Sequence, residues 1–377
     1  MKNNIFGYLF FIFIIGIMSF AIYKANYSEN EQEEANVIEK VSNTSITQKG
    51  KNLTLGISEF DTINPIITKN KKVQDIDKLI FDSLVNIGVD GKVEPSLARE
   101  WETTDNKTYI VKLRSGVKWS DGSYFNSVDV QYTINRLKEA DKASVYAENV
   151  SKVREVDIID NTTLRIILLD TIPFYEYFLT FPIISSNYYS GEDFWDTEKN
   201  ESPISNGRFK IEEVTDNTIS LSKNMNWWNI ENDNSTIENV TINLYSSVAE
   251  LYNAFKLGGI DLIATENANY QEYVGKIGYN VKETEGRNFV FLALNTQNAI
   301  LSDVNVRRAI QCAINKDEIL STIYDSSYSM ADFPISSSNY LVDYSNQNKF
   351  NITEIESNLK TAGWSIIKRT MEKNRKL

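Results

Sequence analysis

Two periodicities in the placement of apolar residues divide the chain into predicted strands and predicted helices. Residues 53–58 (LTLGIS) alternate apolar and small residues, and this period of two is typical of a strand. Residues 109–119, 241–247 and 260–264 are also predicted to be strands. The segment 288–296 (NFVFLALNT) is almost entirely apolar, which predicts a buried strand.

Two longer segments predict β-hairpins, because strand-like runs flank a short polar turn in each. Residues 156–169 are expected to turn at the Asp-Asn pair 160–161. Residues 207–224 are expected to turn at a second Asp-Asn pair, 216–217.

Helices are predicted over residues 127–140, 248–258 and 304–320, each as one continuous element. In the first, Ser127 is the expected N-cap, and one apolar face is formed by Val130, Ile134 and Leu137. In the third, Cys312 is expected to be a small buried residue. Strands that alternate with helices predict an α/β fold.

The first fifty residues differ from the rest. Residues 1–25 begin with one Lys and continue as an uncharged apolar run, which is typical of a signal peptide or of a membrane anchor. Residues 26–50 are polar and acidic, and they predict a flexible tether. We expect an exported protein at the outer face of the cytoplasmic membrane. It is not expected to be a lipoprotein, because no Cys follows the apolar run.

Composition excludes several classes of function. The net charge of −12 argues against a nucleic-acid-binding protein, which needs a basic surface. The chain has no His and a single Cys, so triad catalysis with an imidazole base is excluded. Enzymes that use only carboxylates, Lys or Tyr remain open on composition alone.

Residues 119–122 (WSDG) have two interpretations. Ser120 in this motif suggests a nucleophile, but no His exists to act as its base. The alternative is a tight turn, in which Gly122 adopts the positive φ that other residues resist. We favour the turn, with Trp119 packed inside.

Five collinear blocks of sequence resemble the extracellular solute-binding proteins of family 5, the oligopeptide- and dipeptide-binding proteins of ABC importers. The blocks are residues 84–137, 202–211 with 224–229, 254–263, 291–320 and 359–364. The resemblance implies a two-lobed type II periplasmic-binding-protein fold with an extra subdomain and a ligand cleft between the lobes. It also implies capture of peptides for an ABC permease, by a protein that we expect to be monomeric. The resemblance therefore implies a binding protein and not an enzyme, and no cofactor and no metal site are expected.

The resemblance implies four domain boundaries in this chain. Residues 1–25 and 26–50 are the export segment and the tether. Residues 51–250 form the first lobe, which includes the extra subdomain at about residues 65–185. Residues 251–377 form the N-terminal part of a second lobe. Relatives continue beyond residue 364, so we expect the second lobe to be incomplete and peptide binding to be weakened.

Candidate ligand-binding residues also follow from the resemblance. In the first lobe the loop after the first strand would contact the ligand, and a tyrosine further along would add a flat ring and a hydroxyl group. These residues are Ser58, Glu59, Phe60, Asp61 and Tyr146. The alternative is that the loop only covers the core and that Tyr146 is an ordinary packing residue.

In the second lobe, Phe291 and Asn295 would contact the ligand from the strand predicted over 288–296, and the alternative is that both are core residues. Peptide-binding relatives tend to carry a carboxylate where this chain has Ala293, which puts an inherited charge contact in doubt. Trp227 and Trp228 are expected to pack internally. An oligosaccharide or metal chelate is the alternative solute, and a carbohydrate-active enzyme is a more distant alternative.

Overall fold

The structure is a computed structural model that describes residues 51–264, 272–284, 289–324, 328–335, 339–342 and 349–364. The predicted export segment and tether lie outside these residues. The described chain forms two units: the first comprises the residues up to Asn86 and Val93–Tyr279, and the second comprises Ile87–Lys92 and the residues from Asn280 onward. The boundary expected after residue 250 falls within a helix, Val248–Lys256, that packs on the sheet of the first unit.

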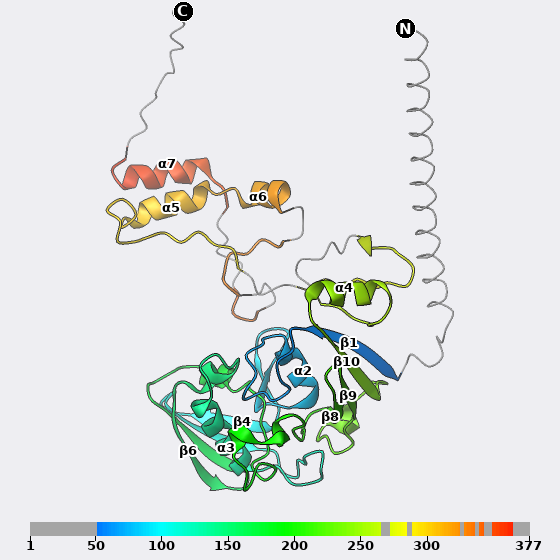
Figure 1. Cartoon of the computed structure of the whole chain (residues 1–377). Helices are drawn as coiled ribbons and strands as arrows, with labels where there is room; N and C mark the ends of the chain where they lie inside the picture. The colour runs from blue at the N-terminus through cyan, green and yellow to red at the C-terminus, as the bar shows by residue number, and fades with distance from the viewer. Residues whose placement is uncertain are drawn as a thin grey trace, which may run out of the picture. The chain divides into compact units, whose positions relative to one another are not determined.

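The first sheet of the first unit has the strand order β1-β10-β9-β8 (Figure 1). These strands are β1 (Asn52–Ser58), β8 (Phe209–Val214), β9 (Thr218–Lys223) and β10 (Asn239–Tyr245). β1 and β10 run parallel, whereas the other neighbours are antiparallel. The predicted strand at 53–58 and the predicted hairpin at 207–224 are therefore confirmed.

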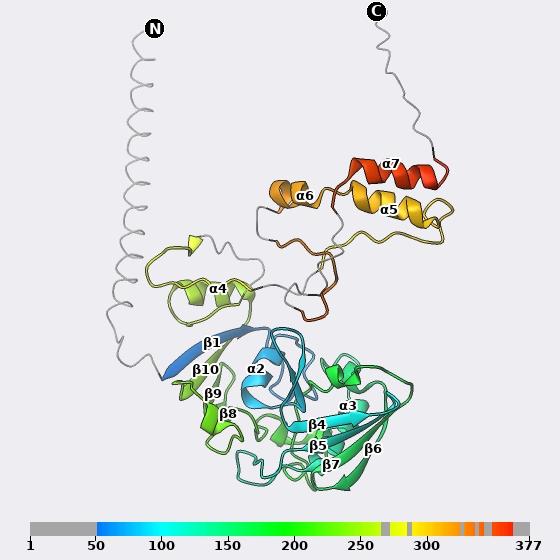
Figure 2. The same cartoon turned by 180° about the vertical axis from the view of Figure 1, so that it is seen from behind.

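The second sheet is fully antiparallel and has the order β4-β5-β7-β6 (Figure 2). Its strands are β4 (Ala98–Thr103), β5 (Thr108–Leu113), β6 (Val153–Asp160) and β7 (Thr163–Leu168). The turn predicted at 160–161 connects β6 to β7. Helix α3 (Ser127–Glu139) packs against β6, and this sheet lies within the range expected for the extra subdomain.

Shorter elements complete the first unit. They are α2 (Val73–Ile80), β2 (Val85–Ile87), β3 (Val93–Pro95), α4 (Val248–Lys256) and the 3-10 helices η1 (Ala147–Val150), η2 (Tyr175–Phe178), η3 (Phe194–Asp196), η4 (Glu198–Asn200) and η5 (Ile230–Asn232). β2 and β3 pair with each other, and α4 packs against β1 and β10.

Two apolar clusters form the core of the first unit. The larger cluster lies between α3 and the second sheet, and it contains the face of α3 predicted from the sequence: Val130, Ile134 and Leu137. The smaller cluster lies between α2 and the first sheet, with Val73 and Ile80 packed on Ile219 and Ile242. Each such side chain contributes roughly 1.5–3 kcal/mol when it is fully buried.

The cap of helix α3 corrects the predicted one. Asn126, not Ser127, is the N-cap: its backbone is extended, and its side chain accepts a hydrogen bond from the amide of Val128. The carboxylate of Asp129 accepts the amide of Asn126 in return at 3.0 Å. Ser127 is already helical, so its own hydroxyl is not in the capping position, and it donates to the carbonyl of Asp160 instead.

The second unit contains three helices among its described residues: α5 (Val304–Ala313), α6 (Lys316–Ile323) and α7 (Ile352–Thr361). α5 packs against α7, and Cys312 is buried there, as predicted. The continuous helix predicted over 304–320 is wrong. The chain becomes extended at Ile314, and the side chain of Asn315 then caps α6 by accepting the amide of Glu318.

Two predicted strands are absent from the described residues. Residues 260–264 and 289–296 adopt no strand, and Phe291 is 70% exposed instead of lying beside a core. An apolar run forms a strand only when a neighbouring strand pairs with its amide and carbonyl groups. The amide of Asp261 donates to the carbonyl of Thr54 on β1, but no regular pairing with a named strand follows for residues 260–264, and none of the named strands pairs with residues 289–296.

The WSDG motif is a turn, as predicted. The amide of Gly122 donates to the carbonyl of Trp119, and the amide of Trp119 donates to the carbonyl of Ser123. Gly122 has a φ of +88°, and Trp119 is completely buried. The hydroxyl of Ser120 accepts the amide of Ser205, so this side chain joins two loops and is not a nucleophile poised beside a base.

Gly122→Ala is expected to lower the free energy of unfolding by about 1 kcal/mol, because a Cβ atom is costly at positive φ. A Cβ atom at this position would meet no other atom within 4 Å, so the cost is purely conformational. Urea denaturation measures it. Gly122→Asn should cost clearly less, because Asn tolerates this conformation, and equal losses for the two variants would contradict the explanation.

Candidate functional site

The carboxyl ends of β1 and β10 meet at one edge of the first sheet, because the two strands are parallel. Ser58 is paired with Tyr245 at this end, and the amide of Glu59 still donates to the carbonyl of Tyr245. Helix α4 begins directly after β10 with Ser247 as its N-cap. Ligands of open α/β sheets bind outside the carboxyl ends of strands, so this edge is the candidate binding site.

Glu59 leaves β1 in an unusual conformation. Its φ is +61°, in the left-handed region that costs a residue with a side chain on the order of 1 kcal/mol. Lys72 holds the residue there, because its ammonium group lies 2.8 Å from the Glu59 carboxylate and 2.8 Å from the Ser58 hydroxyl. The side chain of Asn70 also donates to the carbonyl of Glu59. Opposite charges therefore stand side by side at the exposed end of β1.

Asp61 fixes the rest of the loop that follows β1. Its carboxylate accepts hydrogen bonds from the hydroxyl of Thr68 and from the amide of Lys69, both at 2.7 Å. The carbonyl of Thr68 accepts the amide of Val145, the neighbour of Tyr146. The structure thus brings together the loop of residues 58–61 and the segment that contains Tyr146, as the candidate site requires.

Tyr146 itself is buried, with only 6% of its surface exposed. Its hydroxyl donates to the carboxyl group of Asp77 on α2, at 3.1 Å. In this conformation the hydroxyl group is bonded within the first unit. Tyr146 therefore has the packing role that the sequence analysis gave as the alternative. Contact between Tyr146 and a ligand stays a prediction.

Asp77 is a completely buried acid. One of its carboxyl oxygens accepts the Tyr146 hydrogen bond, and the other has no hydrogen-bond partner. Burial raises the pKa of Asp77 well above its usual value, although the hydrogen bond from Tyr146 acts in the opposite direction. Asp61 raises this pKa further through like-charge repulsion. Asp77 therefore favours the protonated form in the folded protein.

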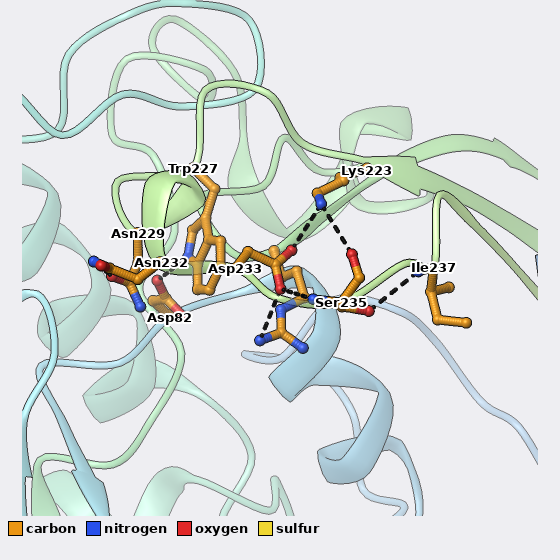
Figure 3. A network of polar contacts seen from close by, with 9 residues as sticks. Asp82, Lys223, Trp227, Asn229, Asn232, Asp233, Ser235 and Ile237 are labelled. Carbon is orange, nitrogen blue, oxygen red and sulfur yellow. Dashed lines mark hydrogen bonds and ion pairs between the residues drawn. The ribbon is translucent and has the colours of Figure 1, made fainter. Parts of the chain in front are cut away.

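A second acid, Asp82, lies half-buried beyond α2. One of its carboxyl oxygens accepts the indole N–H group of Trp227 at 2.8 Å (Figure 3). The same oxygen accepts the indole N–H group of Trp228 at 2.6 Å. Burial raises the pKa of Asp82, and the two indole hydrogen bonds act against this increase. Trp227 is buried as expected, whereas Trp228 is only partly buried, and the contacts of both rings are polar as well as apolar.

The network continues on the outer side of Trp227. The guanidinium group of Arg208 lies over the Trp227 ring at 5.1 Å from its centre, and it pairs with Asp233 at 3.4 Å. Lys223 pairs with the same carboxylate at 3.0 Å (Figure 3). Burial opposes ionisation of Asp233, but the amide of Ser235 and these two cations outweigh it and hold its pKa below the usual value.

Phe291 and Asn295 belong to the second unit. Both are exposed, and the side chain of Asn295 accepts the amide of Gln297. They are therefore accessible rather than part of a core, and their contact with a ligand stays a prediction.

The sequence analysis missed Asp77 and Asp82. Their only signal was that each acid lies among apolar residues in the stretch DIDKLIFDSL.

Within the described residues, no group of three or more carboxylate or thiol side chains could hold a metal ion. In the same residues, no helix combines the length and the apolarity needed to cross a bilayer.

An α/β unit with polar side chains gathered at the carboxyl ends of parallel strands is typical of a ligand-binding protein. The family described as "Bacterial extracellular solute-binding proteins, family 5 Middle" matches residues 92–376, which is more than half of the chain. The chain therefore belongs to the bacterial extracellular solute-binding proteins of family 5, and the resemblance seen in its sequence is confirmed.

Curated relatives bind more than one kind of solute. The periplasmic oligopeptide-binding protein OppA of Salmonella typhimurium is 25% identical over 290 residues, which cover 71% of this chain and 53% of that protein. The nickel-binding periplasmic protein of Escherichia coli is 24% identical over 303 residues, which cover 76% of this chain and 56% of that protein. The chain thus spans about half the length of the curated relatives it matches.

Solved structures show the same fold. The nickel ABC transporter structure from Bacillus halodurans has a TM-score of 0.69 at 22% identity, over 87% of this chain and 67% of that one. The oligopeptide-binding protein AppA of Bacillus subtilis, in complex with a nonapeptide, has a TM-score of 0.56 at 20% identity, over 85% and 66%. The α/β, type II periplasmic-binding-protein fold is confirmed. These relatives are binding proteins, which agrees with the prediction that the chain is not an enzyme.

The buried carboxyl group of Asp77 makes stability depend on pH. Because its pKa is higher in the folded than in the unfolded state, the free energy of unfolding should fall as pH rises above about 4. Asp77→Asn removes this dependence. As the pH rises from 4 to 7, the free energy of unfolding of the variant should therefore increase relative to that of the wild type, by up to about 1.4 kcal/mol per pH unit. Urea denaturation at a series of pH values measures this difference.

Asp216→Asn is the control, because Asp216 is an exposed acid in the turn between β8 and β9 and does not act on Asp77. Its stability relative to the wild type should stay level over the same pH range. If the stability difference between Asp77→Asn and the wild type also stayed constant over this pH range, Asp77 would be ionised in the folded protein and the explanation would be wrong.

Proposed function

We propose that this protein is the extracytoplasmic substrate-binding component of an ABC transporter and that it captures peptides for import. It works as a monomer at the outer face of the cytoplasmic membrane, held there by its N-terminal segment or released after signal cleavage. It delivers the peptide to a membrane permease and needs no cofactor and no nucleic acid. Membership of family 5 and the peptide-binding relatives support this proposal.

The observation that carries the proposal is the exposed end of β1. A free peptide has a carboxylate at one end and an ammonium group at the other. Lys72 and Glu59 present the complementary charges 2.8 Å apart, on a loop that hydrogen bonds hold in place. Such a preorganised pair of charges favours a zwitterionic ligand over a neutral sugar.

The remaining candidate residues supply contacts of other kinds. Phe60 is partly buried against the smaller core, so an exposed part of its ring is available to an apolar side chain. Phe291 and Asn295 add an exposed ring and an amide from the second unit. Rings and amides contact peptides without demanding one sequence, which suits a transporter of mixed peptides.

Other solutes are the alternative, because relatives of similar identity bind nickel as well as peptides. A bare nickel ion held by imidazole is excluded by the absence of His. A metal chelate or an oligosaccharide remains as the second candidate.

Titration calorimetry of the 377-residue chain with mixed dipeptides to pentapeptides tests the proposal. We expect weak but saturable binding, which weakens further by about tenfold, or about 1.4 kcal/mol, in Phe291→Ala and in Glu59→Ala. Phe291 is exposed, so its truncation leaves the fold intact. The Glu59 variant loses a charge that faces solvent.

Tyr124→Ala is the control for Phe291→Ala, because Tyr124 is also an exposed ring and lies outside the candidate site. Peptide affinity should be unchanged in this variant. Binding of a nickel chelate or an oligosaccharide, together with no heat from peptides, would favour the alternative solutes.

A further inference from the structure

We propose that the first unit carries a separate binding site for a small oxyanion, a carboxylate or a phosphate. The site is a surface groove of about 340 Å³ lined by Arg99, Arg114, Ser115, Gly116, Val117 and Trp228. None of the residues predicted to bind the transported solute lines it. We call it the arginine groove.

Arg99 is directed into the groove by an irregularity in the sheet. β4 pairs Ala98 with Leu113 and Glu100 with Lys112, so Arg99 is an extra residue, a β-bulge, between two regular pairs. Bulges re-aim a side chain and are common beside functional sites. The guanidinium group lies 3.7 Å from Glu100, whereas Lys112 is closer to that carboxylate, at 3.0 Å. Arg99 therefore keeps most of its positive charge available.

Arg114 is held rigidly on the opposite wall. Its Nε donates to the carbonyl of Ser96, and its guanidinium group lies 4.1 Å from the centre of the Trp228 ring. The indole N–H of Trp228 is in turn fixed by Asp82. Among the described residues Arg114 forms no ion pair of its own, so its terminal N–H groups are free to receive a ligand.

The floor of the groove adds backbone donors. Gly116 has a φ of +76°, and a Cβ atom there would meet nothing within 4 Å, so the turn is open to solvent. No described residue accepts a hydrogen bond from the amides of Ser115 or Gly116. Successive free amides at a left-handed residue form anion-binding concavities.

These features together select an oxyanion. Two arginines and two residues with unbonded amides line one groove of a chain whose net charge is −12. Arginine binds carboxylate and phosphate through paired N–H donors, and the planar indole beside it leaves room for a small, flat group. The lining contains no carboxylate, so a cation would find only the hydroxyl of Ser115 as a side-chain acceptor.

Thermal unfolding and titration calorimetry with inorganic phosphate and with sodium acetate test the site, against sodium chloride at equal ionic strength. We expect at least one oxyanion to bind and to raise the melting temperature. Arg99→Gln should weaken that binding about tenfold. The relative effect of phosphate and acetate then assigns the preferred anion.

Arg154→Gln is the matched control, since Arg154 is also an exposed strand arginine beside a glutamate, Glu155. This variant should bind the anion as the wild type does. An effect no larger than that of chloride, or equal binding in Arg99→Gln and the wild type, would overturn the proposal. Neither result bears on peptide binding, which the calorimetry with peptides tests separately.

Discussion

The parallel pairing of β1 with β10 is the constraint on which the first unit depends. It joins residues 52–58 to residues 239–245, so the whole second sheet, α3 and the larger apolar cluster lie in the chain between two adjacent strands. Closing so long a loop is entropically costly, but the cost grows only with the logarithm of its length. The same pairing aligns two carboxyl ends at one edge, and this alignment is why a binding site can form there.

Two acids, Asp77 fully buried and Asp82 half-buried, tie the intervening elements to this frame. Asp77 links α2 to the segment around Tyr146, and Asp82 links the end of α2 to the two tryptophans that follow β9. Removing one partner of a buried polar pair costs more than the pair contributes, because the other group is left unsatisfied. These contacts therefore specify one arrangement of the loops, even where their net stabilisation is small.

Local patterns predicted the elements that local interactions determine. The alternation in LTLGIS, the two Asp-Asn turns and the apolar face of α3 all follow from periods that a strand, a turn or a helix imposes. The break at Asn315 was missed because the apolar period continues through it, while the cap depends on one side chain. Residues 289–296 failed as a strand because composition cannot supply a pairing partner.

One part of the candidate site was also predictable from the sequence, and another part was not. The position of Ser58 to Asp61 at a strand end was predictable, since the strand was. The partners of that loop were not, because Lys72, Thr68 and Val145 reach it only after α2 and the second sheet are in place. The burial of Asp77 likewise depends on Tyr146, which is 69 positions away.

The shared oxygen of Asp82 also has an optical consequence. Excitation of an indole moves electron density away from its pyrrole nitrogen, so a negative charge beside that nitrogen stabilises the excited state. Trp227 and Trp228 both direct this nitrogen at Asp82. Their fluorescence therefore shifts to longer wavelength when Asp82 loses its proton, and the protein carries a built-in spectroscopic reporter of the charge in its own interior.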